Sequence, residues 1–177
     1  METLQGASTL ETGRPLLFVD IDGVLNPYGP TCPNGYMEHY LFPEDAEPVR
    51  VCQRHAQWLH QLAQHYGLMW GSAWSEEDRA LLGGVLDLPP FQGAVALPRG
   101  PFDPAEKVPA IERAASGRAL AWIDDMLTPQ AWTWAQNRSV PTLLLPVDPA
   151  IGLTQPQVQR LLKWAAEIRV GRSEPPP

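Results

Sequence analysis

Lysine and cysteine are both scarce in this chain. Its 177 residues include two lysines, Lys107 and Lys163, and two cysteines, Cys32 and Cys52. The 13 Lys and Arg residues are outnumbered by 20 Asp and Glu, and the net charge of −7 argues against a broad basic surface for phosphate backbones. The cysteines have no C-x-x-C pair or other metal-binding spacing, which favours reduced thiols in a cytosolic compartment over a disulfide.

Long apolar runs and a recognisable signal segment are also missing. No apolar run approaches the roughly 20 residues that cross a bilayer. Residues 1–13 lack the basic start and apolar stretch of a secretory signal, so we expect a cytoplasmic protein without a membrane partner. A hydrophobic content of 44% predicts one globular domain over 14–170, between flexible tails at 1–13 and 171–177.

Strand-like and helix-like segments alternate along the chain, and this order predicts an α/β fold with a mostly parallel sheet. The proline-rich and glycine-rich segment 26–48 is predicted to be a short flap, too small for a large cap domain. Strands are expected at 16–22, 67–73, 119–124 and 141–147, with a short one at 93–97, and helices at 49–66, from 75, at 108–115, from 128 and at 154–168.

An Asp-x-Asp-Gly sequence ends the first apolar run. In a strand, residues i and i+2 point the same way, so Asp20 and Asp22 are expected to share a face. Two neighbouring carboxylates raise each other's pKa unless a cation or a shared proton relieves the repulsion. We interpret them as a nucleophile and an acid/base that act with Mg²⁺. An Asp-Gly turn that merely closes the strand is the structural alternative.

Three further positions carry polar groups next to apolar runs. Ser72 offers a hydroxyl to a phosphoryl oxygen, or is a serine in an ordinary turn. Lys107 precedes the predicted helix 108–115 and supplies positive charge for an anion, unless it is a solvated surface lysine. Asp124 and Asp125 are suitable ligands for a hard cation, or a helix N-cap pair. Open α/β sheets bind ligands at such strand ends.

The ordered series resembles one known superfamily. DxDGVLN, then a serine after an apolar strand, then a lysine, then apolar-Asp-Asp, is similar to the haloacid dehalogenase (HAD) superfamily of phosphohydrolases over about 16–147. The resemblance implies a Rossmann-like three-layer fold. More loosely, Trp70 and Trp74 around Gly71-Ser72-Ala73 resemble the HAD domain attached to RNA-repair enzymes.

The resemblance also implies roles for individual residues. Asp20 would attack phosphorus to give an aspartyl-phosphate, and Asp22 would protonate the leaving oxygen and later deprotonate water. Mg²⁺ would be the cofactor. The implied metal ligands are the Asp20 carboxylate, the Asp22 backbone carbonyl, and Asp124 with or without Asp125; the implied phosphate-binding residues are Ser72, Lys107 and Gly23.

The substrate is expected to be a phosphomonoester of unknown class. An aspartate at the second motif position favours a phosphatase over a dehalogenase within this superfamily. The short flap would leave the site open to large substrates, but the acidic balance does not favour a nucleic acid. The alternatives are a non-catalytic binding module with the same fold, a phosphotransferase, and a polynucleotide-end phosphatase.

Overall fold

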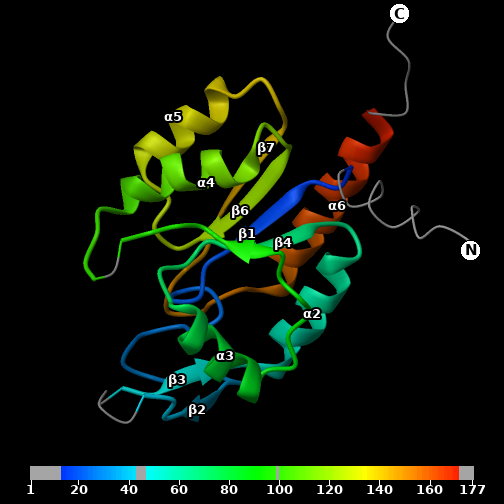
Figure 1. Ribbon diagram of the computed structural model, residues 1–177. Coiled ribbons are helices and arrows are strands. Elements are labelled where there is room, and N and C mark those ends of the chain that lie inside the picture. The colour runs from blue at the N-terminus through cyan, green and yellow to red at the C-terminus, as the bar shows by residue number, and fades with distance from the viewer. Residues whose placement is uncertain (1–12, 43–46, 99, 172–177) are drawn as a thin grey trace, which may run out of the picture.

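A five-stranded parallel sheet forms the centre of the molecule (Figure 1). The computed structural model describes residues 13–42, 47–98 and 100–171. The strand order is β5-β4-β1-β6-β7, and every neighbouring pair is parallel. The strands are β1 Leu16–Val19, β4 Gly67–Trp70, β5 Gly93–Ala94, β6 Leu120–Asp124 and β7 Thr142–Pro146. The predicted α/β class with a mostly parallel sheet is therefore confirmed.

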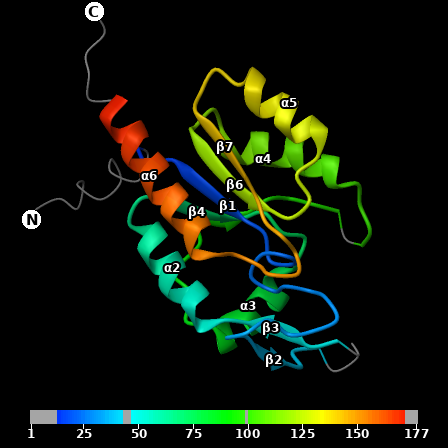
Figure 2. The same ribbon diagram turned by 180° about the vertical axis from the view of Figure 1, so that it is seen from behind.

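Helices cover both faces of this sheet, which gives three layers. Figures 1 and 2 show α2 and α6 on one face and α4 and α5 on the other. The helices are α2 Gln53–Ala63, α3 Glu76–Val85, α4 Lys107–Ala115, α5 Pro129–Asn137 and α6 Gln155–Gly171, with a 3-10 turn, η1, at Pro104–Glu106. The arrangement is Rossmann-like, as the sequence predicts.

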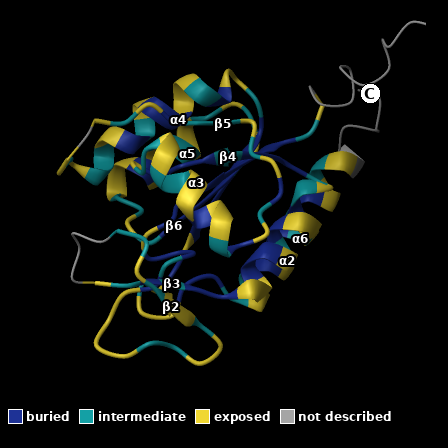
Figure 3. Cartoon of the chain, turned by 60° about the horizontal axis from the view of Figure 1, so that its bottom comes forward, coloured by how far each residue is buried: buried dark blue, intermediate teal, exposed yellow. Residues whose placement is uncertain are grey.

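The alternation of strand side chains divides the core into two parts. Leu17 and Val19 of β1 pack in the larger part, against α2, α3 and α6. Leu16 and Phe18 point to the other face and pack against α4 and α5. A run that is apolar at every position can therefore be buried on both sides, as is typical of parallel sheets. Figure 3 shows these strands buried between helices that carry exposed outer turns.

Local signals define where several helices begin. The Ser75 hydroxyl accepts from the backbone N–H of Asp78, whose carboxylate accepts from Ser75 in return, so α3 starts with a capping box. The Thr128 hydroxyl accepts from the backbone N–H of Ala131 at the start of α5, where Pro129 occupies the first helical position. These two helix starts agree with the sequence prediction.

The predicted helix at 49–66 is wrong at both ends. Val49–Val51 form strand β3, which pairs antiparallel with β2, Met37–His39. Val49 and Val51 are buried while Arg50 between them is less so, and this period of two fits a strand. The flap predicted at 26–48 is thus partly ordered as β2. Its residues 43–46, and tail residues 1–12 and 172–177, lie outside the described residues.

Two further expectations concern membranes and thiols. Among the helices that the structure describes, none has the length and apolar character needed to cross a bilayer. Cys32 and Cys52 are both free, as the sequence predicts.

A buried histidine makes stability depend on pH. Burial lowers the pKa of His55 on α2 to about 4 from 6.5. The pKa of His55 is lower in the folded protein than in the unfolded chain. His55 therefore does not reduce the free energy of unfolding above pH 6.5, but it destabilises the fold as the pH falls from 6.5 towards 4. We expect about 3 kcal/mol of the free energy of unfolding to be lost over this range through His55 alone.

Urea unfolding at several pH values measures this contribution. The variant His55→Gln should lose less stability than the parent between pH 6.5 and 4. His60→Gln, on the exposed side of the same helix, is the control and should follow the parent. Parallel loss in the parent and His55→Gln would contradict the prediction.

Candidate functional site

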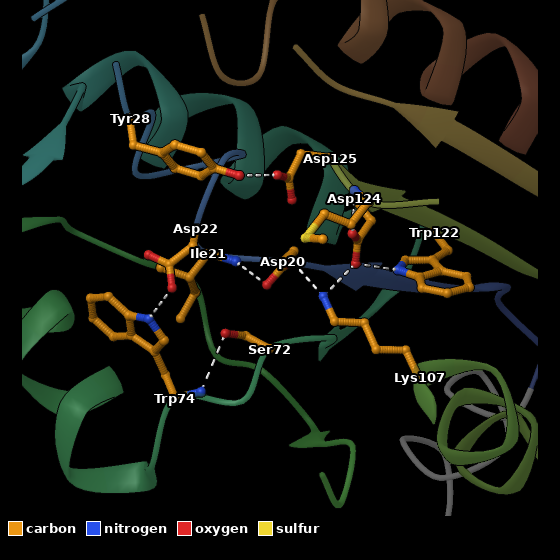
Figure 4. Close-up of polar contacts among 11 residues, drawn as sticks. Asp20, Ile21, Asp22, Tyr28, Ser72, Trp74, Lys107, Trp122, Asp124 and Asp125 are labelled. Atoms are coloured by element: carbon orange, nitrogen blue, oxygen red, sulfur yellow. Dashed lines mark hydrogen bonds and ion pairs between the residues drawn. The ribbon is translucent and has the colours of Figure 1, made fainter. Parts of the chain in front are cut away.

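The polar residues that follow three neighbouring strands meet at one edge of the sheet. Asp20 follows β1, the central strand of the sheet. Ser72 follows β4, the neighbour of β1 on one side, and Asp124 is the last residue of β6, its neighbour on the other side. Lys107 is the first residue of α4 and points into the same region (Figure 4). The carboxyl ends of parallel strands on either side of a central strand form the crevice in which such sheets bind ligands.

The ammonium group of Lys107 lies between two buried carboxylates. Its Nζ is 2.5 Å from Oδ2 of Asp20 and 2.6 Å from Oδ2 of Asp124. Lys107 is only 5% exposed, Asp20 6% and Asp124 0%. The alternative of a solvated surface lysine is therefore wrong. Burial lowers the pKa of Lys107, but the two carboxylates outweigh it and raise the pKa overall, so the side chain is held as a cation.

Both carboxylate oxygens of Asp124 are held by the fold. Oδ2 also accepts from the indole N–H of Trp122, two residues back on the same face of β6, at 3.1 Å. Oδ1 accepts from the backbone N–H of Met126 at 2.8 Å. Thr128 is the N-cap of α5, so the alternative of Asp124 and Asp125 as a helix N-cap pair is wrong.

The surroundings of Asp20 disfavour the ionised form of its carboxyl group. Burial, and next the charge of Asp124, raise its pKa to about 8, although Lys107 acts in the opposite direction. Its Oδ1 accepts from the backbone N–H of Ile21 at 2.7 Å, which fixes the orientation of the carboxyl group. Additional positive charge beside Asp20 would favour its ionised form.

Three aspartates are placed to hold a cation. One oxygen from each of Asp20, Asp124 and Asp125 lies within 4.8 Å of the others. Hard divalent cations prefer carboxylate oxygens, so this group fits the chemistry of a Mg²⁺ or Ca²⁺ ligand set. Both residues of the Asp124–Asp125 pair belong to the group, whereas the sequence analysis leaves the part of Asp125 open.

The expectation that Asp20 and Asp22 share a face is wrong. Strand β1 ends at Val19, and the chain then turns, with the backbone N–H groups of Leu25 and Asn26 both donating to the carbonyl of Ile21. Asp20 is buried towards Lys107, whereas the Asp22 side chain is exposed and is not in the group of three carboxylates. The Asp22 backbone carbonyl as a metal ligand stays a prediction.

Two side chains orient the Asp22 carboxylate. The amide of Asn26 donates to Oδ1 at 2.9 Å. The indole N–H of Trp74 donates to Oδ2 at 2.8 Å, as Figure 4 shows. The Asn26 side chain also accepts from the backbone N–H of Arg50 on β3 at 2.8 Å. The Asp22 carboxylate is thus exposed and points away from Lys107 (Figure 4).

Gly23 makes room for Asp125. Its φ of +73° lies in the left-handed region, and a Cβ there would be 2.4 Å from Cγ of Asp125. The hydroxyl of Tyr28 donates to Oδ2 of Asp125 at 2.5 Å from the other side. Gly23 therefore lets the third carboxylate approach. Its backbone N–H, the one donor that a glycine has, donates to the carbonyl of Asn26 at 2.8 Å, and its contact with phosphate stays a prediction.

Ser72 lies at the same edge of the sheet as Asp20 and Asp124, and its side chain forms a hydrogen bond within its own turn. It is buried, and its hydroxyl accepts from the backbone N–H of Trp74 at 3.3 Å. The preceding residue, Gly71, donates to the carbonyl of Val19, which places Ser72 beside the exit of β1. This arrangement is compatible both with an ordinary turn and with a phosphoryl contact, so the phosphate-binding role stays a prediction.

Sequence reasoning missed the roles of Trp74, Tyr28 and Asn26. Of the two tryptophans around Ser72, Trp70 stacks on Phe91 in the core while Trp74 reaches Asp22. Asn26 was recognisable as a polar residue one turn beyond Asp22. The contact of Tyr28 with Asp125 joins residues 97 positions apart, and no local pattern signals it.

Comparisons with known proteins add little. A scan against models of known families finds no match, and no curated protein matches the sequence. One solved crystal structure superposes with a TM-score of 0.43 and 15% sequence identity, over 89% of this chain and 84% of the other. Similarity at that level carries nothing about function, and the chemistry of the site follows from its own residues.

The close approach of Asp125 to Gly23 predicts an effect on cation binding. Mg²⁺ that binds the folded protein should raise the melting temperature of the parent chain. In Gly23→Ala the new methyl group displaces Asp125, and we expect the Mg²⁺-dependent increase to shrink or vanish. Thermal unfolding with and without Mg²⁺ measures it.

Gly84→Ala is the matched control, because a Cβ at Gly84 on α3 meets nothing within 4 Å. It should keep the full response to Mg²⁺. Equal responses in both variants would show that Asp125 does not contribute to a cation site.

Proposed function

We propose that this protein is a Mg²⁺-dependent phosphatase that hydrolyses a phosphomonoester through an aspartyl-phosphate intermediate. The observation that supports this most is the contact of Lys107 with Asp20, next to Asp124 and Asp125. Asp20, the Lys107 ammonium group and two further carboxylates lie together, and the proposal assigns them the roles of nucleophile, fixed cation and metal ligands. Phosphoryl transfer gains most from such positioning and charge neutralisation.

In this proposal Asp20 attacks the phosphorus atom, and the bond between phosphorus and the leaving oxygen breaks. Asp22 donates a proton to that oxygen, and the organic alcohol departs. Asp22 then takes a proton from water, which attacks the aspartyl-phosphate and releases inorganic phosphate and free Asp20. Asn26 and Trp74 hold the acid/base carboxylate for both transfers.

Lys107 and the aspartate group supply the electrostatics of the proposed reaction. The Lys107 ammonium neutralises charge on Asp20 and on a bound phosphoryl group. Asp20, Asp124, Asp125 and the Asp22 carbonyl would hold Mg²⁺, which supplies charge stabilisation for the phosphoryl oxygens. The hydroxyl of Ser72 would offer a donor to those oxygens, whereas the backbone N–H of Gly23 already donates to the carbonyl of Asn26.

Other functions fit parts of the same geometry. A phosphotransferase would share the Asp20 chemistry and differ in the acceptor alone. A non-catalytic module has no need of the two hydrogen bonds that orient Asp22, which favours the enzyme. The free thiols of Cys32 and Cys52 suit the reducing cytoplasm that we propose as its compartment.

Replacement of the proposed nucleophile is the most direct test. Asp20→Asn preserves shape but not nucleophilicity, and we expect hydrolysis of p-nitrophenyl phosphate with Mg²⁺ to fall at least about a thousandfold. Release of p-nitrophenol measures the rate, and EDTA should abolish the parent activity. Circular dichroism should report an intact fold.

Asp87→Asn, at an exposed aspartate remote from the site, is the control and should keep full activity. Parent activity in Asp20→Asn would rule out the nucleophile. Absence of activity in the parent itself, over a panel of phosphomonoesters, would favour the binding module.

The indole contact to Asp22 predicts a selective defect. In Trp74→Phe one oxygen of Asp22 loses its donor, and we expect roughly tenfold slower turnover of alkyl phosphates, whose leaving oxygen needs a proton. Turnover of p-nitrophenyl phosphate, whose leaving group departs as an anion, should change much less. Initial rates on both esters measure the difference.

Trp132→Phe, at an exposed tryptophan on α5, is the matched control and should affect neither ester. An equal loss on both esters in Trp74→Phe would show that the indole merely supports the local structure.

A further inference from the structure

A cleft of about 950 Å³ opens on the side of the site towards which Asp22 points. Asp22 is itself part of its wall, and so is Trp74, which holds Asp22 in place. Because the acid of the proposed reaction meets the leaving oxygen, the organic part of the substrate extends into this cleft. The volume is ample for a group the size of a small metabolite.

Aromatic rings form much of the wall. Tyr28, Phe42 and Trp74 all line the cleft, and they come from the flap and from the turn after β4. The rings of Phe42 and Trp74 meet edge to face, with centroids 5.3 Å apart. Tyr28 is fixed through its hydroxyl to Asp125. Ring faces attract cations through their quadrupole.

The charged groups of the wall are mostly acidic. Asp22, Glu47 and Asp78 line the cleft, together with Arg50. The Arg50 guanidinium is already engaged, since Nε pairs with Glu38 at 3.1 Å and a terminal nitrogen donates to the carbonyl of Gly29 at 2.9 Å. An additional phosphate or carboxylate on the substrate would therefore meet repulsion, and an ammonium group would meet attraction.

From this combination we infer that the substrate is the phosphomonoester of an alcohol that carries a cationic amine or quaternary ammonium group. The inference rests on the proposed function for the phosphoryl half of the molecule, and on the cleft for the organic half. The phosphoryl group lies at Asp20 and Lys107, while the ammonium group lies against the rings between Glu47 and Asp78. Polyanionic substrates such as nucleic-acid ends do not fit this wall.

Three aryl phosphates of similar leaving-group chemistry test the selectivity. They carry an aminomethyl, a hydroxymethyl or a carboxymethyl group in the para position, so one is a cation, one is neutral and one is an anion at that end. We expect kcat/KM to fall in this order, by about tenfold or more from first to last. Equal values, or preference for the anion or for a phosphorylated oligonucleotide, would overturn the inference and leave the phosphatase intact.

Variants locate the selectivity in the cleft. Glu47→Gln should reduce the preference for the aminomethyl ester, and Glu47→Lys should turn it towards the carboxymethyl ester. Glu167→Gln makes the same change at an exposed position on α6 and should leave all three values unchanged. Loss of preference in Glu167→Gln, or its retention in Glu47→Lys, would contradict the cleft as the origin.

Binding of the phenols that these esters release separates the inference from the proposed function. Tryptophan fluorescence or NMR can follow titration with 4-(aminomethyl)phenol and with 4-hydroxyphenylacetate. Tighter binding of the amine, lost in Glu47→Lys, supports the cleft even if no ester is hydrolysed. Absence of hydrolysis of all three esters rejects the proposed phosphatase activity, whereas equal binding of the two phenols rejects the cationic substrate.

Discussion

The ion pairs of Lys107 with Asp20 and Asp124 are the interaction on which the arrangement of the site depends. They join the ends of β1 and β6 to the first residue of α4, which are distant in sequence. A buried ammonium group and two buried carboxyl groups are costly to desolvate, and their mutual contacts offset this cost only while all three are present. Loss of the lysine would leave two carboxylates facing each other in the interior. The positions of Lys107, Asp20 and Asp124 therefore depend on one another.

The fold holds these three side chains, and Asp22 beside them, in fixed positions. The central strand is apolar at each position and buried on both faces, so its end is rigidly placed between β4 and β6. Burial and the neighbouring charge of Asp124 raise the pKa of Asp20. A positive charge beside Asp20 has the opposite effect and favours its ionised form. Asp22, two residues later, lies outside the buried cluster and is held by Asn26 and Trp74. One short segment thus presents two aspartates in contrasting environments, which suits two different chemical roles.

Much of the fold follows from local patterns, because apolar runs and helix caps are written in neighbouring residues. The capping signals at Ser75 and Thr128 are of this kind. The sequence also predicts that Asp20, Lys107 and Asp124 come together, because each stands at a strand end or at the start of a helix and such ends form the ligand-binding edge of a parallel sheet. The sequence does not reveal that β1 ends at Val19. The prediction that the Asp22 side chain points the same way as that of Asp20 is therefore wrong. The contact of Tyr28 with Asp125 depends on how the flap folds back, and no periodicity encodes that path.

The two bonds made by the Asn26 side chain have a kinetic consequence. One end of this amide holds Asp22, and the other accepts from Arg50 in the strand that borders the cleft. The wall of the cleft at β3 and the Asp22 carboxylate are therefore linked through one side chain. In the proposed reaction, a compound that fits the wall badly would displace Asp22 even when its phosphoryl group is well seated. Discrimination among compounds would then fall on the rate of turnover more than on their occupancy of the protein.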